Sequence, residues 1–190
     1  MTDRRKIDTR IRGAAVVALL ALAAPATGQD QPYAGQEGRE IASLSESDVA
    51  ALLAGEGWGL ALPAELNGYP GPAHVLDLAE QLALTGSQRA EVQAIFDEMK
   101  TEAQAVGAEY VAAEAHVSRM FALGHASPGM LEASLATSSD ALARLRGVHL
   151  AAHLATTPIL TGDQREMYAQ LRGYDGESGG HGGHAGHGDH

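Results

Sequence analysis

The sequence LTGSQR at residues 84–89 returns, with one change, as LTGDQR at residues 160–165. Each copy places a Gln three residues after a Thr, which is the spacing of a helix-starting capping box. In this motif the Thr hydroxyl accepts from the backbone N–H of the Gln, and the Gln side chain accepts from the backbone N–H of the Thr. The first copy therefore predicts the end of one helix and the start of another, and the second predicts the start of a last helix. The pairs are Thr85 with Gln88 and Thr161 with Gln164.

A long helix is predicted after the first junction. Over residues 88–123 the apolar positions advance in steps of three and four, which is typical of a helix with one apolar seam. These positions are Val92, Ile95, Phe96, Met99, Ala103, Val106, Tyr110, Ala113, Val117 and Met120. The sequence GHASPG at 124–129 interrupts the pattern, with Ser127 placed to cap a new helix and Pro128 at its first position.

A second long helix is predicted from residue 130 to about residue 156. Its stripe consists of Leu131, Leu135, Ser138, Leu142, Leu145, His149 and Ala152. Because a short turn joins the two helices, they should fold back as an antiparallel hairpin. The sequence therefore predicts an all-α fold, with short flanking helices and a hooked four-helix arrangement. Aromatic residues make up only 4% of the chain, so the core should be thin, and a homodimer is expected to bury the remaining surface.

The first 28 residues have the layout of a secretory signal peptide. Five basic residues precede an apolar run at 14–24, and small residues follow up to Gly28, where cleavage is expected. The run is shorter than the roughly 17–25 residues that a spanning helix needs. We therefore expect export to the periplasm and no stable membrane insertion.

Differences in amino-acid composition divide the rest of the chain into four predicted segments. Residues 29–46 are polar and are expected to form a flexible arm. Residues 47–71 should hold a short helix capped by Ser47 and then a Gly/Pro-rich loop. Residues 72–172 form the predicted helical-hairpin domain, and the His/Gly-rich residues 173–190 are expected to be a disordered tail.

Charge and residue types exclude several functions. The chain contains no cysteine, so packing alone must hold the fold. Loss of the first 28 residues would leave 8 basic and 22 acidic residues, a formal charge of −14. Such a surface disfavours nucleic acid and attracts cations. No nucleophile elbow, phosphate-binding Gly-rich loop or HExxH sequence is present, and the chain is not expected to be an enzyme.

Histidine provides the clearest chemical signal. His149 and His153 lie four residues apart on a predicted helix, so both imidazoles could hold one metal ion. His149 also interrupts an apolar stripe in which Leu or Val would pack better. In a hairpin this pair lies opposite the middle of the first helix, near Glu98 and Glu102, and His74 could approach from the other side. The alternative is one core histidine and one surface histidine.

Two further groups contain histidine. His116 and Met120 are also four residues apart, and a thioether would favour copper(I), although Met120 is equally suited to the core stripe. In the tail, histidine recurs at every third position, and this segment is expected to bind zinc, copper or nickel with low specificity. The tail residues are His181, His184, His187 and His190.

The signal peptide, the cysteine-free hairpin and the two LTxxQ sequences together resemble the LTxxQ family of bacterial periplasmic proteins. The resemblance covers roughly residues 72–172, and its specific marks begin at Leu84 and Leu160. The family includes Spy- and CpxP-like envelope-stress chaperones, the zinc-linked ZraP and CnrX-type heavy-metal sensors. The resemblance implies a hooked helical hairpin that is usually dimeric and lies in the periplasm.

The sensor branch of this family also implies a set of metal ligands. Its members use a histidine before the first junction, a carboxylate on the following helix and a His-xxx-Met pair before the second junction. The matching positions in this sequence are His74, Asp97 or Glu98, and His149 with His153. Because His153 replaces the thioether, the expected metal changes from nickel or cobalt towards zinc or copper.

The expected function is binding of a divalent transition metal in the periplasm, for sensing, buffering or resistance. The family also implies an alternative, an ATP-independent chaperone of the Spy/CpxP type, which the strongly acidic composition makes less favoured. Expected partners are a second copy of the chain and either unfolded periplasmic clients or a membrane-bound signalling protein.

Overall fold

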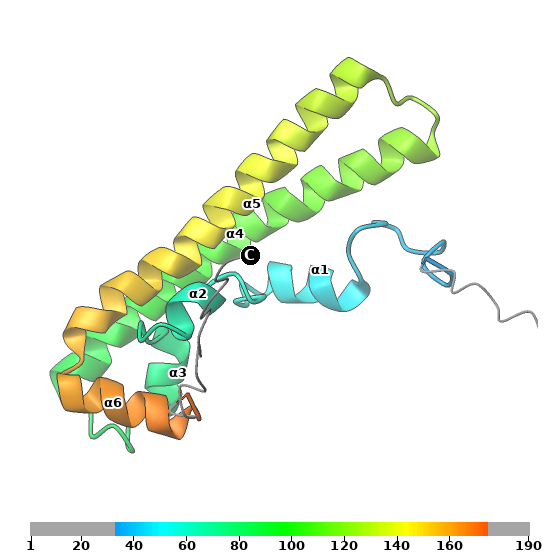
Figure 1. The fold of residues 1–190 in the computed structure, drawn as a ribbon. Helices are drawn as coiled ribbons and strands as arrows, with labels where there is room; N and C mark the ends of the chain where they lie inside the picture. The colour runs from blue at the N-terminus through cyan, green and yellow to red at the C-terminus, as the bar shows by residue number, and fades with distance from the viewer. Residues whose placement is uncertain (1–32, 175–190) are drawn as a thin grey trace, which may run out of the picture. The chain divides into compact units, whose positions relative to one another are not determined.

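The structure is a computed structural model that describes residues 33–174. The chain divides into two units, residues 1–34 and residues 35–190, and every helix of the described residues belongs to the second unit. These residues form helices and no strands (Figure 1), which confirms the predicted all-α class. The elements are α1 (Glu46–Leu53), α2 (Leu62–Glu65), α3 (Pro72–Asp77), α4 (Gly86–Ala122), α5 (Pro128–Thr156), the 3₁₀ turn η1 (Thr157–Ile159) and α6 (Gly162–Leu171).

The long helices α4 and α5 lie side by side and run in opposite directions (Figure 1). Gly124 ends α4 with a left-handed backbone, at a φ of 67°, which a glycine adopts without steric cost. The hydroxyl of Ser127 then accepts from the backbone N–H of Met130 and so caps α5, with Pro128 in the first turn. Within residues 33–174, no helix is long and apolar enough to cross a membrane.

Short side chains line the contact between α4 and α5. The buried residues in the first half of α5 are Ser134, Ser138 and Ala141, whereas Leu135 is 48% exposed. The predicted apolar stripe is therefore wrong at Leu135, whereas Leu131 is half-buried and Ser138 is buried. Small residues allow the two helix axes to approach more closely than leucines would. Ser138 also donates a hydrogen bond to Glu114 of α4.

The segment before α4 packs against the helix pair. Ile41, Leu44 and Leu52 are buried in one core with residues of α4 and α5. Part of the predicted flexible arm is thus packed, because two of its apolar residues, Ile41 and Leu44, cover the helix pair. The helix α1 is capped by Ser45 and not by the predicted Ser47, since the Ser45 hydroxyl accepts from the N–H of Asp48.

Both predicted capping boxes are present. The side-chain oxygen of Gln88 accepts from the N–H of Thr85 at 3.0 Å, and that of Gln164 accepts from the N–H of Thr161 at 2.9 Å. The two Gln amides also pair with each other, each Nε2 donating to the other Oε1, at 2.8 and 3.1 Å. A second core lies at these junctions and contains Val75, Leu82, Val92, Leu160 and Tyr168.

Candidate functional site

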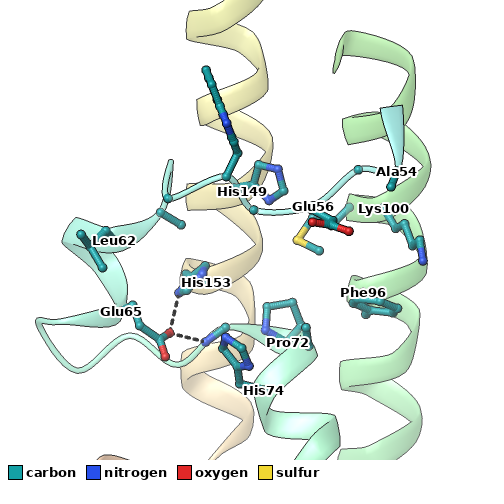
Figure 2. Close-up of a pocket in the computed structure, with 18 of the residues that line it drawn as sticks. Ala54, Glu56, Leu62, Glu65, Pro72, His74, Phe96, Lys100, His149 and His153 are labelled. Carbon is teal, nitrogen blue, oxygen red and sulfur yellow. Dashed lines mark hydrogen bonds and ion pairs between the residues drawn. The ribbon is translucent and has the colours of Figure 1, made fainter. Parts of the chain in front are cut away.

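A cavity of about 480 Å³ opens beside α4 and α5 in the region of the predicted histidine pair. Its other walls come from the segment after α1, from α2 and from the start of α3 (Figure 2). Arg172 and Tyr174, which follow α6, also line it. Trp58, Phe96 and Met99 supply apolar surface. Apolar walls with a few convergent polar groups are the usual form of a ligand site. Three predicted metal ligands line this cavity: His74, His149 and His153.

His149 is a buried histidine with an unpaired ring nitrogen. Its side chain lies on α5 and the residue is only 3% exposed. Among the described residues, Nε2 of His149 is the one buried side-chain nitrogen or oxygen that has no hydrogen-bond partner. Burial lowers the pKa of His149 below its ordinary value, and the neighbouring His153 lowers it further. The imidazole is therefore neutral at neutral pH, the form in which histidine binds metals.

His153 lies one helical turn later and is held at one ring nitrogen. Its Nδ1 is 2.6 Å from the backbone carbonyl oxygen of Tyr69. Because a carbonyl only accepts, Nδ1 must carry a proton, and in the neutral ring this leaves the lone pair on Nε2. Metal-binding histidines commonly have this arrangement, in which the second ring nitrogen donates to a carbonyl or carboxylate. The ring also closely approaches Gly71.

Glu65 is a buried carboxylate that the sequence patterns did not identify. The residue is 8% exposed, and its Oε2 lies 3.7 Å from Nδ1 of His153 (Figure 2). Its Oε1 accepts from the hydroxyls of Tyr168 at 2.5 Å and Tyr174 at 3.0 Å, and Nε of Arg172 lies 3.4 Å away. Burial raises the pKa of Tyr168, and its hydrogen bond to Glu65 raises it further.

No local sequence signal could have revealed these contacts of Glu65. Its two tyrosine partners lie 103 and 109 positions further along the chain. The only hint is an acidic residue inside a loop that is otherwise rich in Gly, Pro and Leu. Such a residue is exposed in most loops, so its burial depends on the tertiary fold.

The structure does not bring Glu98 to the three histidines. Glu98 is exposed, whereas Phe96, Met99 and Lys100 of the same helix line the cavity. Each residue turns about 100° around a helix, which places Glu98 on the side of α4 opposite to these three residues. The assignment of Glu98 as a ligand is therefore corrected. His74 lies at the cavity, but its side chain is 44% exposed and its Nδ1 is 3.8 Å from Asp77.

The other histidine groups lie elsewhere or outside the described residues. Met120 is buried in the core at 3% exposure while His116 is exposed, which fits the packing alternative for this pair. The predicted tail site, formed by the histidines from His181 to His190, lies outside residues 33–174. Within the described range, no group of three or more His, Asp or Glu side chains is arranged to hold one ion.

Comparison with family models, curated proteins and solved structures finds no match to this chain. The resemblance to the LTxxQ family therefore depends on the two repeated sequences and on their junctions. In the structure these sequences start α4 and α6 in the same way and contact each other through Gln88 and Gln164.

Proposed function

We propose that this chain is a periplasmic protein that binds a divalent transition metal through His149 and His153. One observation carries the proposal. Nε2 of His149 is buried without a partner, one helical turn from an imidazole whose Nδ1 is already held by the carbonyl of Tyr69. An unsatisfied buried polar group costs about 1–3 kcal/mol, and coordination to a metal ion would remove that cost.

The surroundings of the pair fit such an ion. Desolvation keeps His149 neutral, so no proton has to leave before the ring binds. The carbonyl of Tyr69 fixes the tautomer of His153, and Glu65 lies behind the same ring nitrogen. Imidazole ligands suit zinc and copper, and also nickel or cobalt. A bound ion would supply positive charge and open coordination positions in the cavity.

Other features of the sequence support the location and the family. The signal-peptide layout supports export to the periplasm, and the two LTxxQ sequences support membership of that family. Metal binding would then serve sensing, buffering or resistance, and the tail histidines would bind further ions with low specificity. The same resemblance implies a homodimer, which sedimentation equilibrium of the purified protein would test.

The test is calorimetric titration of zinc and copper(II) into the chain in which all four tail histidines are replaced by Ala. We expect one tight equivalent, lost in the His149→Ala, His153→Ala double variant. A second double variant, His116→Ala with His125→Ala, removes two exposed imidazoles and should bind as the parent does. Equal binding by the His149/His153 variant and its parent would contradict the assignment.

A further substitution separates metal binding from a structural role. His149→Leu replaces the unpaired ring by an apolar side chain of similar size. Because the uncompensated burial disappears, the metal-free protein should become more stable by about 1 kcal/mol, while zinc binding is lost. Urea unfolding in the presence of a chelator measures the first effect. A loss of stability would show that His149 is needed for packing.

A chaperone function is the second candidate, and exposed apolar residues favour it. Phe121 and Leu123 at the end of α4 are 57% and 64% exposed, and Met130 of α5 is 43% exposed. Clustered exposed apolar side chains are typical of binding surfaces for other proteins. A chaperone function would be supported if the protein suppresses aggregation of a denatured client and the Phe121→Ser, Leu123→Ser variant suppresses it less. No protection at several-fold molar excess would exclude it.

A further inference from the structure

We propose that the tip of the α4–α5 hairpin, defined as residues 115–131, binds the surface of a phospholipid bilayer by inserting its exposed apolar side chains. Figure 1 shows this tip at the end of the hairpin away from α6. The inference adds an interaction surface and the class of its partner. It does not depend on the proposed metal site, because no residue of the tip lines the cavity beside His149 and His153.

The tip extends beyond the part of α4 that the preceding segment covers. Among the described residues, the hydrogen bond from this segment that lies closest to the end of α4 joins the N–H of Ala42 to the hydroxyl of Ser118 at 3.1 Å. Ser118 lies four residues before the end of the helix at Ala122. Every residue from 121 to 130 is exposed. The turn and the two helix ends beside it are therefore available to a flat surface.

Three large apolar side chains in the tip remain in contact with solvent. Phe121 and Leu123, at the end of α4, are more than half exposed, and Met130, in the first turn of α5, is 43% exposed. The turn between them, residues 124–129, contains no Asp, Glu, Lys or Arg. Insertion removes apolar area from water, and the gain in free energy grows with that area. A bilayer takes up such side chains at the boundary between its headgroups and its acyl chains.

The tip carries little charge, although the chain as a whole is strongly acidic. No Asp or Glu occurs between Glu114 and Glu132, and Arg119 is the one Lys or Arg in this interval. Without the first 28 residues, the chain has a formal charge of −14. An anionic lipid surface repels the acidic parts of the chain but not the tip. The tip is thus the part of the hairpin that can approach such a surface without an electrostatic cost.

The length of α4 keeps its acidic side chains away from the lipid when the hairpin stands on its tip. Glu114 is eight residues from the end of the helix at Ala122, which corresponds to about 12 Å along the axis. Electrostatic repulsion is screened over about 8 Å at physiological ionic strength. On α5, Glu132 lies nearer to the turn, but Arg119 offsets its charge. Repulsion between the acidic side chains of these helices and an anionic lipid surface is therefore largely screened.

The positions of the three apolar side chains favour a lipid surface over a groove in a folded protein. Grooves that bind a helix recognise apolar residues at spacings of three, four and seven along one helix. Phe121 and Leu123 are only two residues apart, and Met130 belongs to the next helix. No single helix face presents all three. A bilayer interface requires only that the apolar side chains share one end of the hairpin.

The experiment is co-sedimentation of the protein with phosphatidylcholine vesicles. Residues 1–28 are removed, because their apolar run would itself bind lipid and every helix of the described residues is retained. Phe121→Ser with Leu123→Ser should lower the partition coefficient about tenfold. Leu66→Ser with Leu154→Ser is the matched control, since these leucines are 56% and 61% exposed but lie outside the tip. A parent that does not bind, or a control that loses as much binding as the tip variant, would overturn the inference.

A second readout locates the inserted residues. Phe121→Trp adds an indole at the tip, and its fluorescence should shift to shorter wavelength on vesicles and be quenched by lipids brominated on their acyl chains. The parent has Trp58 as its one tryptophan, in the wall of the cavity, and its fluorescence should not respond. An unchanged emission of Phe121→Trp at saturating lipid would contradict insertion of the tip.

Salt separates apolar insertion from binding by charge. Binding to phosphatidylglycerol vesicles should be weaker at about 0.01 M salt than at about 0.15 M, because a Debye length of about 30 Å at the lower salt lets the lipid repel the acidic helices. Stronger binding at the lower salt would overturn the inference. Suppression of client aggregation without any binding to vesicles would also overturn it, and would leave the chaperone function in place.

Discussion

Gly71 fixes the space available to His153. A Cβ atom at this position would lie 2.8 Å from Cε1 and Nε2 of the imidazole, closer than real Cβ contacts. The ring has little freedom to retreat, because Tyr69 and Glu65 hold its other nitrogen. A side chain at position 71 must therefore displace the ring or the backbone, and either movement would disturb the candidate metal site.

We expect Gly71→Ala to lower the free energy of unfolding by about 1–3 kcal/mol, as overpacked sites do, and to weaken zinc binding. Urea unfolding followed through Trp58, the one tryptophan of the sequence, measures the stability. Gly147→Ala on α5 is the matched control, since nothing lies within 4 Å of its added Cβ. That change should stabilise the helix by about 0.5–1 kcal/mol. Unchanged zinc affinity in Gly71→Ala would show that His153 moves freely.

At the level of single residues, the sequence predicts part of the candidate metal site. The spacing of His149 and His153, and the interruption of an apolar stripe, identified two side chains that do line one cavity. The role of Glu65 was not predictable, because its burial depends on contacts with distant residues of α6 and the chain beyond it. Glu98 was chosen by its position along the hairpin and by the resemblance, although the predicted apolar seam through Phe96 and Met99 already places Glu98 on the other side of α4.

At the scale of elements, the carboxylate of Asp48 ties α1 to the loop that follows it. The indole N–H of Trp58 donates to this carboxylate at 3.0 Å, and the N–H of Ser45 donates at 2.9 Å. Hydrogen bonds from the Ser45 side chain and from Trp58 lower the pKa of Asp48 to about 2. The folded-state pKa is thus below the unfolded value, so the stabilisation is complete at higher pH and is lost as pH falls.

The stabilisation by the Asp48 carboxylate should be lost as pH falls from about 3.8 towards 2. We expect the urea midpoint, read by Trp58 fluorescence, to fall between about pH 4.5 and about pH 2.5 in the parent protein and to fall less in Asp48→Asn. Glu46→Gln, in the same first turn, lacks the bond to Trp58 and is the matched control. A parallel fall in the parent and in Asp48→Asn would contradict the role of this carboxylate.

The two helix junctions should be energetically coupled. Gln88 and Gln164 each cap their own helix and also donate to the other amide. Each Gln→Ala substitution should cost about 1–2 kcal/mol. The double variant should lose about 1 kcal/mol less than the sum, because the shared hydrogen bonds can be lost only once. Denaturant unfolding of all four proteins measures the coupling, and strictly additive losses would refute it.

The same elements show why the starts of α4 and α6 were predictable, whereas the face of α5 near Leu135 was not. A capping box depends on residues three positions apart, so Thr85 with Gln88 and Thr161 with Gln164 could be recognised locally. The buried face of α5 depends on the distance to α4. Serine and alanine at that contact allow a close approach, and this turns Leu135 outward, a result that hydrophobicity alone would not predict.

For the whole molecule, the candidate site and the tail should affect stability differently. From its Gly-rich composition the tail is expected to bind metal in the folded and unfolded chain alike, and such binding does not change the folding equilibrium. Replacing the four tail histidines by Ala should therefore lower the number of zinc ions bound but keep the zinc-induced rise in Tm. The His149→Ala, His153→Ala variant should lose the zinc-induced rise in Tm and keep the zinc ions that the tail binds. Scanning calorimetry of both variants with and without zinc measures these changes in Tm. A zinc-induced rise in Tm that disappears when the tail histidines are replaced would refute the prediction.

The pairing of Gln88 with Gln164 uses only uncharged groups. Neither amide titrates, and salt does not screen a contact between neutral partners. The bond between α1 and the loop that carries Trp58, in contrast, depends on the ionised carboxylate of Asp48. Acid would therefore weaken the bond between α1 and its following loop and leave the pairing of the two Gln side chains intact. The proposed export would expose the chain to the acidity of its surroundings, and there the uncharged link between the starts of α4 and α6 would persist after the bond between Asp48 and Trp58 is lost.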